Sequence, residues 1–204
     1  MTYLEFQKIA SRQPVIDIRN IAAYFSGLNA RRLYEWQQKG YIRKITNGFY
    51  VLTETPIDEG LLRNIASLIC QPSYIGLESA LAYYGFIPEA VFQTVSVTTR
   101  RSRLIKTPAG DFRYRSIHKE LFFGYNAVEV ENKRFFISDP EKTLLDMVYF
   151  TPGADRREVL EGLRLNLEEV RSIVNMNRMA DYLELFSSPK IFRAFRHLRE
   201  MLND

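Results

Sequence analysis

Residues 29–38 (NARRLYEWQQ) form a short run whose side chains could contact nucleic acid. Within this run, only Leu33 and Trp36 are large and apolar at a core spacing, so a helix here would bury one side. At about 100° per residue, the opposite side carries a set of polar and aromatic groups, namely Arg31, Tyr34, Glu35 and Gln38. The spacing predicts an amphipathic helix whose outer face is rich in hydrogen-bonding groups.

Several of these groups have matching partners on the base edges of DNA. A helix fits the major groove, where arginine pairs with guanine O6 and N7, glutamine with adenine, and a carboxylate accepts from cytosine N4. We therefore expect Arg31, Gln38 and Glu35 to contact bases. Arg32 lies nearer the buried side, where a phosphate contact is expected. The alternative is that residues 31–38 are only the solvated face of a surface helix, since such faces are normally polar.

The residues around this helix predict the elements that position it. Asp17 is a suitable N-cap for a helix that begins directly after it and precedes residues 29–38. The apolar positions of this helix run to Phe25. Ser26-Gly27 breaks that helix, Leu28 fills the turn, and Asn29 caps the second helix, which ends at Gly40. Two short helices joined by a tight turn are therefore expected.

A basic hairpin follows the second helix. Tyr41-Ile42 and residues 49–52 (FYVL) flank a polar tip, and Asn47-Gly48 favours a hairpin turn because both residues tolerate positive φ. On this tip, Arg43, Lys44 and Asn47 would follow the DNA backbone or the minor groove. Helix, turn, helix and basic hairpin are the outline of a winged helix-turn-helix, which we assign to residues 1–56.

Composition and length fit a globular protein with a sizeable core. The chain has 204 residues, of which 46% are hydrophobic and 25% charged, with no low-complexity tract. It contains no run of about 18 apolar residues and no signal peptide, so we expect a cytoplasmic protein without membrane contact. The single Cys70 excludes an intramolecular disulfide and a cysteine-rich metal site. We expect neither a metal nor a cofactor.

Charge is concentrated in two basic blocks. Residues 1–56 hold eight Lys and Arg against four acids, and residues 95–120 hold seven against two, although the whole chain carries only +4. The basic residues of the second block are Arg100, Arg101, Arg103, Lys106, Arg113, Arg115 and Lys119. Strand alternation places Arg113 and Arg115 opposite Phe112 and Tyr114. The block is either an auxiliary surface for DNA backbone, or for an acidic or RNA-bearing partner, or a solvated sheet face with its aromatic side inward.

The remaining patterns predict an α+β chain. Helix is expected at 2–11, capped by Thr2, and a short strand at 15–16. Residues 53–56 form a linker to a second domain, 57–204, which is mixed α+β with a helical C-terminal end. Its expected helices are 57–69, 77–84, one begun by Asp139-Pro140, 156–165, 166–176, 179–186 and 189–202. Its expected strands are 91–98, 103–106, 111–117, 122–123, 127–130 and 133–137.

An enzymatic function has little support in the sequence. Asp139, Glu141 and Lys142 superficially resemble a restriction-type nuclease site, but Glu141 and Lys142 are adjacent and follow a proline that begins a helix. The two histidines, His118 and His197, are far apart and lack a zinc-site spacing. No phosphate-binding glycine loop or nucleophile elbow is present. We expect no catalytic residues.

Three segments together with the predicted winged helix carry a family resemblance: YIGLESALAYYGFIPEAVFQTVSVTT, TPAGDFRYRSI and FFISDPEKTLLDMVY. In this order and spacing, residues 5–150 resemble the AbiEi family, the antitoxins of bacterial abortive-infection toxin–antitoxin pairs. The resemblance implies DNA-contact roles for Asn29, Arg31, Arg32, Tyr34, Glu35 and Gln38, and a wing role for Lys44 and Asn47. Ser79, Tyr83, Arg115, Glu141, Lys142 and Asp146 are family-like residues of the second domain, to which the sequence assigns no chemical role. For Lys142 and Asp146, a structural i,i+4 pair is favoured.

The expected function is sequence-specific binding of double-stranded DNA by a transcriptional autorepressor that acts as an antitoxin. Two copies would occupy inverted repeats in the promoter of the chain's own operon. The alternative is an interaction protein whose C-terminal domain neutralises a nucleotidyltransferase-like toxin, with DNA binding secondary.

Overall fold

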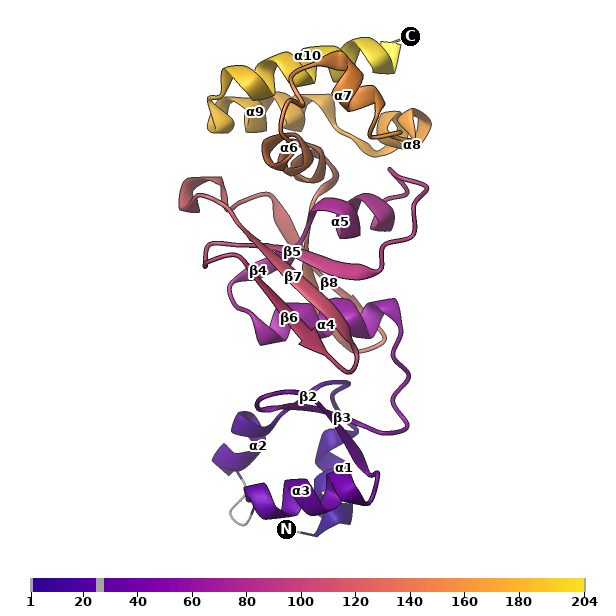
Figure 1. Cartoon of the computed structure of the whole chain (residues 1–204), viewed down its shortest axis with the longest axis vertical. Coiled ribbons are helices and arrows are strands. Elements are labelled where there is room, and N and C mark those ends of the chain that lie inside the picture. Colours follow the sequence, from indigo (N-terminus) through magenta and orange to yellow (C-terminus); the bar gives the residue numbers. More distant parts are fainter. Residues whose placement is uncertain (1, 25–27, 204) are drawn as a thin grey trace.

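The computed structural model describes residues 2–24 and 28–203, which form three parts stacked along the long axis of the molecule (Figure 1). We call them the N-terminal unit (2–52), the central unit (58–138) and the helical unit (140–203). Helices and strands are mixed along the chain, so the α+β class is confirmed. Within the described ranges, no helix is long and apolar enough to cross a membrane.

The N-terminal unit begins with α1 (Tyr3–Ala10), which has the capping box that Thr2 and Glu5 predict. It continues through β1 (Ile16–Asp17), α2 (Ile18–Tyr24), α3 (Ala30–Gln38), β2 (Ile42–Thr46) and β3 (Phe49–Leu52). Asp17 accepts a hydrogen bond from the backbone N–H of Arg19 at 3.0 Å, as an N-cap does. The predicted helix end at Phe25 and the break at Ser26-Gly27 lie outside the described residues.

The predicted hairpin is present, but its turn differs in detail. Gly48 takes a positive φ of 84°, whereas Asn47 does not belong to the residues with positive φ. A register shift lies between Lys44 and Thr46, so Thr46 pairs directly with Phe49. One left-handed residue is enough here because the bulge absorbs the extra residue of β2.

The three strands of the N-terminal unit lie in the order β1-β3-β2, and the central strand β3 is buried on both faces. On one face, Ile16, Ile42, Tyr50 and Leu52 join Leu33 and Trp36 of α3 in one apolar cluster. On the other face, Ile45, Phe49 and Val51 join a cluster with Leu61 and Ile65 of the central unit. The hairpin therefore packs between α3 and the central unit (Figure 1).

The central unit is a mixed sheet of six strands in the described chain, in the order β6-β7-β5-β4-β9-β8. The strands are β4 (Ser73–Ile75), β5 (Gln93–Thr98), β6 (Arg103–Thr107), β7 (Gly110–Ser116), β8 (Tyr125–Val130) and β9 (Lys133–Ser138). β4 pairs parallel with β9, β5 pairs parallel with β7, and the other neighbours are antiparallel. The predicted hairpin of β6 and β7 is confirmed, and Glu131 and Asn132 both take positive φ in the β8–β9 turn.

Two strand predictions are corrected. Phe122 and Phe123 do not form a strand. They follow a short 3₁₀ helix, η1 (Lys119–Leu121), and lie in a loop, where Phe122 and Phe123 pack against two different apolar clusters. Residues 73–75, for which no strand is predicted, form the strand β4 near the centre of the sheet. β4 is only three residues long, too short for an alternating pattern to be recognised.

Helices cover the two sheet faces unequally. α4 (Glu59–Ile69) packs on the face of Phe112 and Tyr114, whose hydroxyl donates to the Ala66 carbonyl at 2.8 Å. The opposite face, with Tyr74 and Val97, packs against loop and helix residues that include Phe122 and Phe150. α5 (Leu77–Tyr83) follows β4 directly and contacts both β5 and α6.

The helical unit comprises α6 (Pro140–Phe150), α7 (Arg157–Glu161), α8 (Leu167–Ile173), α9 (Met176–Phe186) and α10 (Pro189–Asn203). All five correspond to predicted helices, with ends shifted by a few residues. They share one apolar cluster that also includes Leu81 and Phe86, the residues that attach the central unit to it.

Candidate functional site

The predicted DNA-contacting helix is α3, and its inner side is firmly held. Asn29 caps it by accepting a hydrogen bond from the Arg32 backbone N–H at 3.0 Å. Leu33 and Trp36 are 7% and 6% exposed, and the Trp36 ring packs against Phe6 with centroids 4.7 Å apart. Helix α3 therefore has a fixed orientation relative to α1 and the sheet.

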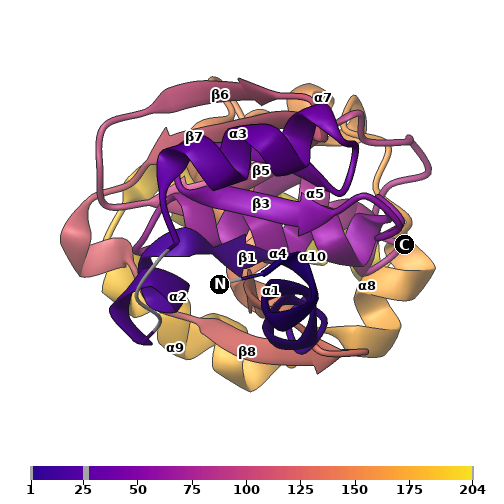
Figure 2. The same cartoon turned by 90° about the horizontal axis from the view of Figure 1, so that it is seen from below.

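The outer side of α3 carries the predicted contact residues together. Arg31, Tyr34, Glu35 and Gln38 are all exposed, and Tyr34 is 61% exposed although it is aromatic. The Arg31 Nε lies 3.0 Å from Glu35 Oε1, so these two residues form an i,i+4 ion pair. Arg32 is half-buried at the edge of this face. Seen from below, α1 and α3 lie in front of the other elements, so α3 lies at one end of the molecule (Figure 2).

The hairpin residues are placed less uniformly than the sequence suggests. Lys44 and Asn47 are exposed, and Lys44 pairs with Tyr50, on the sheet side that packs against α3. Arg43 instead pairs with Val51 near the base of the hairpin, and its Nη2 donates to the Thr55 carbonyl at 2.6 Å. Arg43 therefore lies away from the tip, on the side that faces the central unit.

The second basic block does not form one surface. Arg113 and Arg115 do lie on the face opposite Phe112 and Tyr114. Arg103 lies on the other face, where its guanidinium stacks on Tyr114 and donates to Cys70 Sγ at 2.8 Å. Lys106 lies opposite Asp111 in the register of β6 and β7, and Arg100 and Arg101 are exposed in the loop before β6. The charge excess is divided between two sheet faces and a loop.

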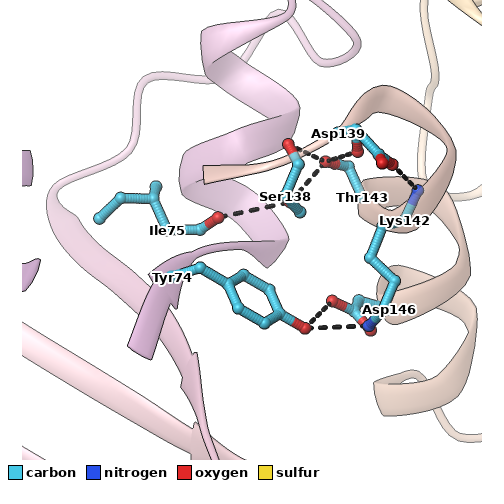
Figure 3. Close-up of polar contacts among 7 residues, drawn as sticks. All are labelled: Tyr74, Ile75, Ser138, Asp139, Lys142, Thr143 and Asp146. Atoms are coloured by element: carbon cyan, nitrogen blue, oxygen red, sulfur yellow. Dashed lines mark hydrogen bonds and ion pairs between the residues drawn. The ribbon is translucent and has the colours of Figure 1, made fainter. Parts of the chain in front are cut away.

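A buried polar network joins β4, the end of β9 and α6 (Figure 3). Lys142 and Asp146 form an ion pair with both side chains fully buried. The Tyr74 hydroxyl donates to Asp146 at 2.7 Å and accepts from Lys142 Nζ at 2.9 Å. The same ammonium lies 5.2 Å from the ring centroids of Phe123 and Phe186, which adds cation–π attraction.

The first turn of α6 extends this network to α9. Asp139 caps α6 through the Lys142 backbone N–H and accepts from the Tyr182 hydroxyl at 2.7 Å. Glu141, which is 1% exposed, accepts from the Asn175 backbone N–H at 2.5 Å. The segment SDPEKTLLD thus connects the sheet to α6 and α9, the first and fourth helices of the helical unit.

Burial shifts the pKa values of these groups. It lowers the pKa of Lys142 and raises the pKa of Asp146, while their mutual attraction opposes both shifts. Burial also raises the pKa of Asp139 and of the Tyr74 hydroxyl. Because every member contacts protein groups and the central pair is fully buried, the arrangement positions helices rather than presenting a reactive surface.

The other family-like residues have separate surroundings. Ser79 accepts from the Val95 backbone N–H at 2.8 Å and fixes α5 to β5. Tyr83 is 38% exposed beneath the Arg63 guanidinium, and Arg115 stacks on Phe150. Tyr74 and Tyr182 are members of the buried network that sequence reasoning missed. An isolated tyrosine carries no spacing pattern, so no sequence signal could have found them.

Among residues 2–24 and 28–203, no cluster of three or more His, Cys, Asp or Glu side chains is placed to hold a metal ion. Comparison with known protein families finds no match, and comparison with curated proteins finds none either. The resemblance to AbiEi antitoxins therefore stays a prediction from the sequence segments quoted above.

Proposed function

We propose that the N-terminal unit is a winged helix that binds double-stranded DNA with sequence specificity, and that the chain is a repressor of its own promoter. The observation that carries this proposal is the outer side of α3, where Arg31, Tyr34, Glu35 and Gln38 are all exposed on a helix whose other side is buried. The helix lies at the end of the molecule farthest from the helical unit, where a duplex could approach it (Figure 1).

The Arg31–Glu35 pair refines the expected roles. Glu35 accepts from Arg31 Nε, which leaves the two terminal nitrogens of the guanidinium for guanine O6 and N7. In this arrangement Glu35 holds Arg31 in position and does not itself contact a base. Gln38, about one turn after Glu35 on α3, is exposed and can pair with adenine.

The hairpin would supply sequence-independent contacts. Lys44 is exposed on the sheet side that packs against α3, so it can meet phosphates of the same duplex. Asn47 is exposed at the turn and can donate to the backbone. Arg43 is a weaker candidate because its guanidinium already donates to Thr55.

The resemblance to AbiEi antitoxins supplies the regulatory setting of this proposal. It suggests a cytoplasmic autorepressor that binds inverted repeats as two copies. Paired half-sites raise affinity and specificity without new base contacts.

Fluorescence anisotropy of the full-length protein on its own upstream DNA and on a shuffled duplex, at two salt concentrations, tests the proposal. We expect a preference of about 10³-fold or more for the native site and a steep loss of affinity with salt. Arg31→Ala should remove about 1–3 kcal/mol of that preference. Lys44→Ala should weaken both duplexes alike and reduce the salt slope by about one.

Arg196→Ala is the matched control, because Arg196 is an exposed arginine on α10 in the helical unit. It should leave both affinities unchanged. Equal and weak binding to the two duplexes would refute sequence-specific repression. An equal effect of Arg31→Ala and Arg196→Ala would refute the role of α3.

A further inference from the structure

A cavity of about 310 Å³ lies between the central unit and the helical unit. Its walls come from α5, the loop after α5, β7, the end of α6 and the segment after α7. Most of the wall is apolar, and this apolar part comprises Leu77, Leu81, Ile87, Met147, Phe150 and Leu163. Three charged residues also line it: Arg115, Glu78 and Glu89.

Arg115 is the unusual member of this wall. It is half-buried and its guanidinium lies 4.9 Å from the centroid of the Phe150 ring. Within the described part of the chain, no hydrogen bond and no ion pair involves this guanidinium. By contrast, Arg113 on the same strand donates to Gln93 at 3.0 Å, and Arg103 donates to Cys70.

A guanidinium has five N–H donors in a planar fork that matches the two oxygens of a carboxylate. Stacking on Phe150 occupies one face of the Arg115 group and leaves its edge donors free. An unpaired arginine edge beside apolar walls fits a ligand with one carboxylate on an apolar body.

The two glutamates add a second requirement. Glu78 and Glu89 are exposed, so they mark the rim of the cavity, and the Glu89 contact with Arg164 is a loose one at 3.9 Å. Two carboxylates at the rim disfavour a dianionic ligand such as a phosphate ester and attract a cation. The charge pattern therefore suits a ligand with an anion at one point and a cation at another.

The cavity volume limits the size of this ligand. Pockets for small molecules span about 300–1,000 Å³, so a cavity of about 310 Å³ accepts a molecule of amino-acid size. Leu77 at its wall has a φ of 52°, in the left-handed region, and such strain is often found at ligand sites.

We propose that this cavity binds a free α-amino acid with an apolar side chain. The carboxylate would pair with Arg115, the ammonium would face Glu78 and Glu89, and the side chain would contact Leu81, Met147 and Leu163. This proposal is independent of DNA binding.

Isothermal titration of the full-length protein with L-leucine, 4-methylpentanoate and 3-methylbutylamine tests the proposal. These probes carry both charges, only the carboxylate and only the ammonium, on similar apolar bodies. We expect L-leucine to bind most tightly, the acid less tightly and the amine least. Arg115→Gln should weaken L-leucine binding about tenfold or more, because it removes a charged hydrogen-bonding partner.

Arg113→Gln is the matched control, since it changes an arginine two residues away on the same strand and sheet face. It should leave the affinity unchanged. The proposal is overturned if L-leucine does not bind at millimolar concentration, or if both arginine variants weaken binding equally. If Arg115→Gln does not fold, the wild-type comparison still decides, because an amine that binds as tightly as the acid would exclude pairing with Arg115.

Discussion

The buried Lys142–Asp146 pair gives the sharpest stability prediction. Both side chains are fully buried, and the Tyr74 hydroxyl bonds to both of them (Figure 3). Lys142→Met leaves the Asp146 carboxylate buried without its cation, and Asp146→Leu leaves the ammonium without its anion. Removing one partner of a buried pair costs about 3–5 kcal/mol.

The double variant Lys142→Met with Asp146→Leu should be less damaging than the sum of the single variants. It removes both charges, and methionine fits the aromatic surroundings of Phe123 and Phe186 well. We therefore expect a coupling energy of about 2 kcal/mol or more in a double-mutant cycle. Urea unfolding followed by circular dichroism measures all four free energies.

An exposed pair of the same spacing serves as the control. Glu161→Gln breaks the contact between Arg157 Nε and Glu161 Oε1, which is 2.8 Å long with side chains about half exposed. It should cost about 0.5 kcal/mol or less. Single variants of the buried pair that cost no more than Glu161→Gln, or costs that simply add in the double variant, would refute the reasoning.

Two further predictions concern neighbouring parts of the fold. The hydrogen bond from Lys133 lowers the pKa of Asp58, so the Asp58 carboxyl of the folded state binds fewer protons than that of the unfolded state. The ionised carboxylate therefore stabilises the fold above about pH 4, and this contribution is lost as the pH falls through the lowered pKa. Asp58→Asn keeps a capping oxygen but should flatten the acid side of the stability–pH curve, measured by thermal unfolding; an unchanged curve would contradict this. Gly124→Ala should destabilise the chain by about 1–3 kcal/mol, because φ is +67° and the new Cβ would lie 3.0 Å from both Lys142 Cβ and Tyr182 Cε2. Unfolding in urea measures this loss of stability. An unchanged free energy of unfolding would show that both neighbours can move.

Local signals in the sequence predict the elements with strong caps and turns. Thr2 with Glu5, Asn29 and Asp139-Pro140 mark helix starts that the structure confirms. The β8–β9 turn at Glu131-Asn132 is confirmed for the same reason, since its backbone conformation depends on adjacent residues. These features need no knowledge of the rest of the chain.

Features that depend on distant residues were not predictable in this way. The pairing of Lys142 with Asp146 follows from helical spacing, but its complete burial depends on Tyr74, Phe123 and Phe186, which come from other elements. The position of Arg43 likewise depends on the Thr55 carbonyl, twelve residues away. Neither contact leaves a periodic trace in the sequence.

The burial of β3 on both faces has a consequence for how the chain could be divided. Ile45, Phe49 and Val51 are at most 5% exposed because they pack against the central unit. A fragment cut at residue 56 would present these side chains to water and is expected to aggregate or lose its fold. For the same reason, α3 cannot swivel on the linker. If two copies bind inverted repeats, the permitted spacing between half-sites is set by the body of the whole chain.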